Sequence, residues 1–195
     1  MTKFSPFAIL AAVGALSLGA CARQDAPAND GAMGNEVVAD GNAIGTMQSV
    51  NFVGGDGAAL GSVSLSDGAG GATMSVTASG MPAGVHGIHL HEKGLCDGPK
   101  FDSAGGHWNP GAKKHGRDNP AGAHLGDLAN LEVGGDGRAT VNTMVAGAMM
   151  SSGANMLADA DGTSLVVHAK PDDYKTDPSG DSGDRVACAV LAGPK

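Results

Sequence analysis

The sequence has few aromatic side chains and few basic ones, and no long amphipathic helical period. It holds four Phe, one Tyr and one Trp in 195 residues, against 33 Gly. With 12 Lys and Arg against 20 Asp and Glu, the formal net charge is −8, which argues against a nucleic-acid partner because such a partner needs a basic face. The apolar fraction of 42% still supplies a core, and abundant Gly, Ser, Thr and Val favour short strands and many turns.

The first twenty residues have the pattern of an export signal. Lys3 precedes a mostly apolar stretch, residues 4–20, which ends in Leu-Gly-Ala directly before Cys21. A membrane-spanning helix is the alternative, but it needs about 20 apolar residues and Pro6 shortens the run. The ending resembles the lipobox of bacterial lipoproteins, in which the cysteine is lipidated. We therefore predict that residues 1–20 are a signal peptide and that Cys21 carries a lipid, with simple secretion as the alternative.

The segment after Cys21 predicts an exported, tethered protein. Residues 21–45 lack any apolar period and are rich in Ala, Asn, Asp and Gly, which is typical of a flexible tether. The folded domain is then residues 46–195. Export to a periplasm follows from the signal, and Ala22 differs from the aspartate of an inner-membrane retention signal. We therefore expect a lipid anchor in the outer membrane.

Three cysteines are present, Cys21, Cys96 and Cys188, and an odd number in an exported protein needs an explanation. If Cys21 carries lipid, the other two can form a disulfide in an oxidising compartment. That bond would close a loop of roughly 90 residues, which stabilises the fold by about 4–5 kcal/mol in the chain-entropy description. Two unrelated buried thiols are the alternative.

Alternation of apolar and polar residues predicts an all-β fold. In Ala72–Ala78, for example, Met74, Val76 and Ala78 share one face of a strand. Gly-Asp-Gly sequences at 55–57 and 135–137 are typical of turns that need positive φ. Eight strands are predicted, which indicates an antiparallel sandwich or barrel: Met47–Val53, Ala58–Ser66, Ala72–Ala78, Gly87–Glu92, Asp127–Val133, Arg138–Val145, Ser164–His168 and Arg185–Leu191. The two long stretches without a period, 93–126 and 169–184, are expected to carry function.

Histidines are placed where a metal site would need them. His89 and His91 share one face of a predicted strand because the period is two, while Ile88 and Leu90 point to the other face. His168 ends another predicted strand. The loop at 93–126 and its exit supply further donors: His107, His115, His124 and Asp127. Imidazole-rich donors without thiolate favour copper or zinc, and six histidines with one aspartate fit two ions that share a ligand.

These segments together resemble a bacterial, exported copper/zinc superoxide dismutase of the lipoprotein type. The resemblance covers most of residues 46–191 and lies in the ordered segments 84–92 (GVHGIHLHE), 103–110 (SAGGHWNP), 114–116 (KHG), 124–128 (HLGDL), 165–168 (LVVH) and 185–190 (RVACAV). It implies a flattened eight-stranded antiparallel Greek-key barrel with two long functional loops. It also implies the cofactors copper and zinc.

The resemblance implies a role for each matching residue. Copper would be held by His89, His91, His107 and His168, and zinc by His107, His115, His124 and Asp127, with His107 as the bridge. Asp172 would accept hydrogen bonds from His89 and His115. The resemblance further implies a framework His86 outside the metal sets, a disulfide between Cys96 and Cys188, and an Arg185 at the mouth of the copper channel.

The implied activity is dismutation of superoxide to dioxygen and hydrogen peroxide, with copper cycling between Cu(II) and Cu(I) and His107 carrying a proton. Lys113, Lys114 and Lys175 are candidates for attracting the anionic substrate, although they are equally well solvated loop lysines. The protein is expected to be a monomer or homodimer. The alternative is a non-catalytic exported copper/zinc-binding protein, which Arg185 disfavours because a store needs no anion-guiding arginine; zinc-only hydrolysis would leave the copper ligands redundant.

Overall fold

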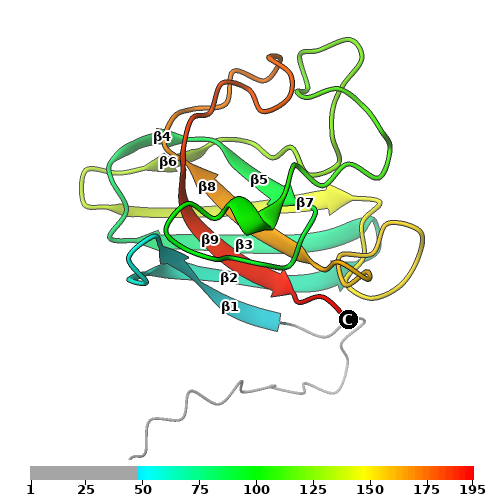
Figure 1. Ribbon diagram of the computed structural model, residues 1–195, viewed down its shortest axis with the longest axis horizontal. Helices are drawn as coiled ribbons and strands as arrows, with labels where there is room; N and C mark the ends of the chain where they lie inside the picture. Colours follow the sequence, from blue (N-terminus) through cyan, green and yellow to red (C-terminus); the bar gives the residue numbers. More distant parts are fainter. Residues whose placement is uncertain (1–47) are drawn as a thin grey trace, which may run out of the picture. The chain divides into compact units, whose positions relative to one another are not determined.

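The computed structural model describes residues 48–195, which form nine strands and one short 3₁₀ helix (Figure 1). The elements are β1 (Gln48–Gly54), β2 (Ala59–Gly68), β3 (Gly71–Ser79), β4 (Gly84–His86), β5 (Ile88–His91), η1 (Asp102–Ala104), β6 (Leu131–Val133), β7 (Arg138–Ala146), β8 (Thr163–His168) and β9 (Arg185–Ala192). Within this part of the chain, no helix is long and apolar enough to cross a membrane. The predicted signal peptide, lipidated Cys21 and most of the tether lie outside the described residues.

The strands pair only antiparallel within residues 48–195. Seven of them form a curled sheet in the order β5-β8-β9-β1-β2-β3-β7, and β4 pairs with β6 in a second ladder. Neighbours such as β5 and β8 are far apart in sequence, so long connections cross the end of the sheet, as in a Greek-key arrangement. Figure 1 shows the strands curving around a common interior. The predicted all-β class is confirmed.

The strand count is nine in the described residues where eight were predicted. The expected strand Gly87–Glu92 is β5, and the three-residue β4 before it is too short to show alternation. The strand expected from Asp127 begins at Leu131 instead. Asp127 Oδ2 accepts the backbone N–H groups of His124 and Gly116 at 2.9 and 2.8 Å, so this residue closes a turn and does not extend a ladder.

Alternating side chains build the core as expected. Met74, Val76 and Ala78 of β3 are buried, while Thr73 and Thr77 between them are exposed. Ile88 and Leu90 of β5 enter the same core. Each such fully buried apolar side chain contributes about 1.5–3 kcal/mol. One face of β5 is therefore fixed by packing, which leaves the face of His89 and His91 to the functional loops.

The two long loops lie over the same end of the sheet and contact each other. Figure 1 shows the segment between β5 and β6 and the segment between β8 and β9 next to each other above the strands. Asp177 joins them, because its Oδ1 accepts the His115 backbone N–H at 2.8 Å and its Oδ2 lies 2.9 Å from Lys114 Nζ. The backbone N–H of Asp118 also donates to the Tyr174 carbonyl at 2.9 Å. The loops therefore form one layer above β5 and β8.

A disulfide fixes the start of the first loop to the last strand. Cys96 and Cys188 are bonded, with their Cα atoms 5.7 Å apart and 92 residues between them in sequence. Around this bond Phe101, Ala104 and Val166 form a small apolar cluster. The predicted pair is confirmed.

Candidate metal centre

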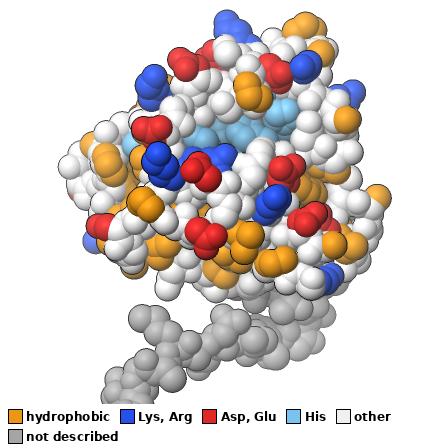
Figure 2. All heavy atoms as spheres, viewed as in Figure 1, with side chains coloured by type: hydrophobic (Ala, Val, Ile, Leu, Met, Phe, Trp, Pro, Cys, Tyr) orange, Lys and Arg blue, Asp and Glu red, His pale blue; other side chains and the backbone are white. Residues whose placement is uncertain are grey.

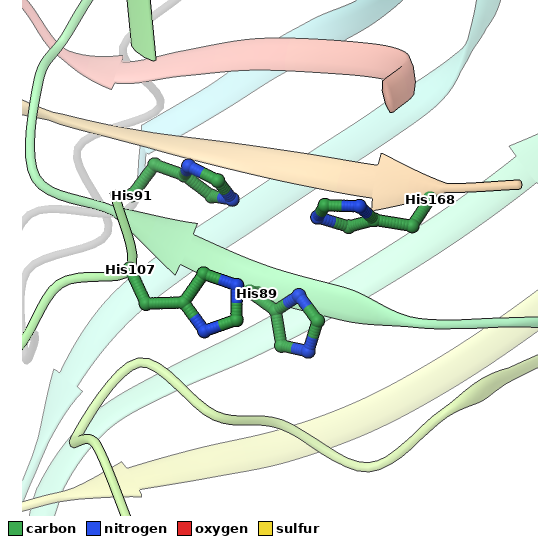
Figure 3. Close-up of side chains that lie close together, drawn as sticks. All are labelled: His89, His91, His107 and His168. Carbon is green, nitrogen blue, oxygen red and sulfur yellow. The ribbon is translucent and has the colours of Figure 1, made fainter. Parts of the chain in front are cut away.

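Four buried histidines meet where β5, β8 and the first loop come together (Figure 3). β5 supplies His89 and His91, and β8 ends at His168. The loop returns beside β5, where the Trp108 N–H donates to the Leu90 carbonyl at 2.7 Å and His107 bridges His91. One ring nitrogen from each of these four histidines lies within 4.8 Å of the others.

Each of the four rings uses one nitrogen for a fixed hydrogen bond. The partners are Asp172 Oδ2 for His89 Nε2 at 2.9 Å, the Gly105 carbonyl for His91 Nδ1 at 3.0 Å, Asp127 Oδ1 for His107 Nδ1 at 2.9 Å and the Gly183 carbonyl for His168 Nδ1 at 3.1 Å. The opposite nitrogens, His89 Nδ1 and the Nε2 atoms of the other three, are buried without a hydrogen-bond partner among the described residues. Buried polar atoms normally have partners, so four converging exceptions fit the donor set of a metal ion. The fixed hydrogen bonds hold each ring in that orientation.

A second donor set surrounds one carboxylate oxygen. Asp127 Oδ1 lies 2.9 Å from His107 Nδ1 and 3.1 Å from the Nδ1 atoms of both His115 and His124. The Nδ1 atoms of His124 and His107 are 3.4 Å apart. Ligands of a tetrahedral zinc, at about 2.0–2.1 Å from the ion, lie about 3.3 Å from one another. Three nitrogens and one oxygen therefore have the spacing that this ion requires.

His107 belongs to both sets, because its Nε2 faces the first group and its Nδ1 the second. His89, His107, His115 and Asp127 also bring their ligand atoms within 4.8 Å of one another. We place His89 in the first set, because its Nε2 is engaged by Asp172 and its Nδ1 is the buried nitrogen without a partner.

Asp172 connects the two sets from behind. Its Oδ2 lies 2.9 Å from His89 Nε2 and its Oδ1 lies 2.9 Å from His115 Nε2. The side chains of all three residues are fully buried. The structure thus brings the predicted Asp172 to the predicted neighbours.

Burial sets the protonation of the first set. It lowers the pKa of His89 and His91, and it lowers that of His107 to about 4 and of His168 to about 3, with neighbouring imidazoles acting in the same direction. These rings are therefore neutral at neutral pH, which leaves a lone pair for a metal.

The second set has charged partners. Burial acts to lower the pKa of His115, but hydrogen bonds to Asp127 and Asp172 outweigh it and raise the value to about 9. Burial acts to raise the pKa of both carboxyls, yet their bonds to imidazoles hold these pKa values well below the usual range. The two aspartates are anionic across the physiological range, as a cation site requires.

Arg185 lies at the mouth of a cleft beside the first set. The guanidinium donates to the carbonyls of Phe101 and Gly105, each at 2.6 Å. The cleft has a volume of about 590 Å³ and is lined by Pro99, Lys100, Asp102, Gly183, Asp184 and Arg185. Figure 2 shows histidine atoms exposed on this face between acidic and basic side chains. Burial lowers the pKa of Arg185, but an arginine remains charged at any working pH.

The predicted substrate-attracting lysines do not line this cleft. Lys114 is paired with Asp177 at 2.9 Å, and the lysine that faces the cleft with Arg185 is Lys100. Sequence reasoning missed Lys100, although its place four residues after the disulfide cysteine Cys96 ties it to the strand that bears Arg185. The signal was therefore present in the predicted disulfide.

His86 takes no part in either set. Its Nδ1 lies 2.8 Å from the His168 carbonyl and its Nε2 lies 3.0 Å from the Pro82 carbonyl. Both ring nitrogens are thus engaged by backbone, close to the end of β8. This is the framework position that was expected for it.

Two nitrogen-rich donor sets sharing one imidazole, over an antiparallel barrel, define a class of metalloprotein. Residues 59–191 match the family model of copper/zinc superoxide dismutases, and the chain belongs to this family. It is 36% identical over 182 residues to the superoxide dismutase-like protein YojM of Bacillus subtilis, covering 92% of each chain. It is 41% identical over 140 residues to a copper/zinc superoxide dismutase of Caulobacter vibrioides, covering 70% of this chain and 80% of the relative. The crystal structure of a superoxide dismutase-like protein from Bacillus subtilis superimposes with a TM-score of 0.71 at 38% identity, covering 73% of this chain and 97% of the other.

Proposed function

We propose that the protein dismutates superoxide to dioxygen and hydrogen peroxide. Copper is held by His89, His91, His107 and His168, and zinc by His107, His115, His124 and Asp127. The observation that carries the proposal is the set of four buried ring nitrogens that face one another without a hydrogen-bond partner in residues 48–195. Membership of the copper/zinc superoxide dismutase family supports both the metals and the substrate.

Copper supplies a one-electron change between Cu(II) and Cu(I), while zinc has no redox change and organises ligands. Two superoxide anions then give one dioxygen and one hydrogen peroxide, and two protons are consumed. His107 holds one of these protons at Nε2, because its Nδ1 is directed to Asp127 and the zinc set. The second proton comes from water.

Arg185 binds the anion. Two of the guanidinium nitrogens donate to backbone carbonyls, so the group is fixed in place, and its remaining N–H groups are left for a small anion. The protein is acidic overall, so positive charge at the cleft must concentrate the substrate locally. Lys100, which lines the same cleft, supplies part of that charge.

The decisive experiment removes the metals and returns them one at a time. Protein stripped with a chelator is expected to lose superoxide-consuming activity, to regain it with copper, and to gain none with zinc alone. Elemental analysis should find one copper and one zinc per chain, and the copper EPR signal should change in a His107→Ala variant. The relative named superoxide dismutase-like keeps a non-catalytic metal-binding protein as the competing function. Fully metallated protein that leaves superoxide decay at the background rate would establish that alternative.

We also propose that the protein is exported and lipid-anchored at Cys21, in the outer membrane. The support is the apolar stretch ending in Leu-Gly-Ala-Cys, together with a disulfide in the folded domain, which needs an oxidising compartment. A labelled fatty acid should be incorporated into the wild-type chain and not into Cys21→Ser. Unlabelled wild-type protein released in soluble form from the periplasm would instead indicate simple secretion. Monomer and homodimer are distinguished by the mass in solution.

A further inference from the structure

Asn130 binds the backbone of Asp172 through both ends of its side-chain amide. Its Oδ1 accepts the Asp172 N–H at 2.9 Å, and its Nδ2 donates to the Asp172 carbonyl at 3.0 Å. Asn130 lies just before β6 at the exit of the first long loop, while Asp172 lies in the second loop. One side chain therefore satisfies both polar backbone groups of a residue in another segment, as a neighbouring strand would.

Tyr174 closes the same arrangement from the other direction. Its hydroxyl oxygen accepts the Asn130 backbone N–H at 2.9 Å, and its own N–H donates to Asp172 Oδ1 at 2.7 Å. The guanidinium carbon of Arg117 lies 3.7 Å from the centre of the Tyr174 ring, a distance at which a cation is attracted to an aromatic face. The ring is thus held between the two loops.

Gly180 encloses the carboxylate on a further side. A Cβ at this position would lie 1.8 Å from Asp172 Oδ1 and 2.7 Å from His115 Nε2. The φ of Gly180 is +68°, which a glycine adopts without the cost that other residues have. Asp172 therefore has little freedom to move away from His89 and His115.

From these contacts we propose that Asn130, assisted by Tyr174, is a positioning residue of the metal centre. This inference rests on the proposed function, since it assigns a role toward its two metals. Asn130 touches no proposed ligand through its side-chain contacts given above; it fixes the backbone of Asp172, whose carboxylate orients one imidazole from each set. Loss of the amide leaves all seven proposed ligands in the chain and disturbs the orientation of His89 and His115 together.

The test compares Asn130→Ala, Tyr174→Phe and wild type in the purified protein. Zinc affinity is measured by competition with a chromophoric chelator, and the copper site by its EPR spectrum. Asn130→Ala is expected to weaken zinc binding about tenfold and to shift the copper EPR parameters, because two hydrogen bonds to Asp172 are lost. Tyr174→Phe keeps the ring over which Arg117 lies and removes one acceptor, so a smaller change in the same direction is expected.

Asn119→Ala is the matched control. Asn119 also joins the two loops, through an Nδ2 bond of 3.3 Å to the Lys175 carbonyl, but it does not touch Asp172. Zinc affinity and EPR should stay at wild-type values in this variant. Equal losses in Asn119→Ala and Asn130→Ala would indicate general loosening of the loops and overturn the proposal.

A second substitution covers the case in which Asn130→Ala does not fold. Asn130→Asp has almost the same shape, but it places a carboxylate oxygen against the Asp172 carbonyl where the amide N–H donates. The same spectroscopic shift and loss of zinc affinity are expected. Wild-type values in the folded variants contradict the positioning role alone, whereas wild-type protein that binds neither metal contradicts the proposed function and the positioning role with it.

Discussion

His91 and Arg185 donate hydrogen bonds to the same backbone oxygen, that of Gly105, at 3.0 and 2.6 Å. One residue belongs to the proposed copper set and the other to the mouth of the cleft. The carbonyl between them therefore fixes the position of the anion-binding group relative to the imidazole. Gly105 has a φ of +75° and lies directly after η1, so a short, tightly turned segment sets this distance.

Arg185→Lys is expected to lower the rate of superoxide consumption at least tenfold while copper content stays unchanged. A lysine ammonium is a single point donor and cannot bind the carbonyls of Phe101 and Gly105 together as the planar guanidinium does. The rate is measured by pulse radiolysis at saturating copper, with metal content from elemental analysis. Arg138→Lys in the exposed part of β7 is the control and should have wild-type rates. An Arg185→Lys protein as fast as wild type would contradict the role given to Arg185.

Removing the disulfide should destabilise the protein and slow it. The bond spans 92 residues, and a loop of that length corresponds to about 4–5 kcal/mol of stability in the chain-entropy description. The double substitution Cys96→Ser with Cys188→Ser also frees the segment whose Phe101 carbonyl binds Arg185. We expect a large fall in Tm by calorimetry and a lower rate per bound copper. Added reductant should reproduce both changes in wild type and neither in the double variant.

Lys100→Glu should slow the reaction several-fold at low salt. The substitution replaces positive by negative charge in the cleft that Arg185 lines, and the substrate is an anion. Added salt should reduce the difference between variant and wild type, because mobile ions screen exposed charges. Lys195→Glu makes the same change in net charge outside the lining of the cleft and is expected to have a much smaller effect. Equal slowing by both substitutions would assign the effect to net charge instead.

The metal-free protein should be most stable near pH 6.5. Burial lowers the folded-state pKa of His107 to about 4 and of His168 to about 3 from an ordinary 6.5, so their stabilising effect is complete above 6.5 and is lost as the pH falls toward these values. His115 acts in the opposite sense. Despite its burial, bonds to two carboxylates raise its pKa to about 9, and its contribution is lost as the pH rises from 6.5 through 9.

Denaturant titrations of chelator-treated protein at a series of pH values measure this profile. His168→Gln removes one titrating ring and should make the acid side of the profile shallower while leaving the alkaline side unchanged. A stability that is flat between pH 4 and 6.5 would show that the buried imidazoles do not control the acid side.

The strands and the metal-binding histidines were readable from the sequence because both follow local rules. Alternation in residues 72–78 identifies a half-buried strand, and the same period places His89 and His91 on one face. The Gly-Asp-Gly turns were also readable, since Gly57 and Gly137 have φ of +83° and +75°. Residue type, period and turn chemistry are properties of neighbouring residues, so one sequence is enough to show them.

The parts that were missed depend on contacts between distant segments. β4 has three residues and exists through its pairing with β6, which no local pattern shows. Asn130 and Tyr174 have ordinary loop composition, and their roles follow only from the meeting of the two long loops. Lys100 was passed over for lysines in the same loops, because the sequence does not show which side chains reach the cleft.

His107 presents one nitrogen to each donor set, so neither half of the centre can be redesigned through this position by itself. Any replacement there removes a donor from both halves at once, and a ring moved toward one partner is drawn from the other. Attempts to exchange one metal for a different ion therefore have to begin at residues that serve a single set, such as His91 or His124.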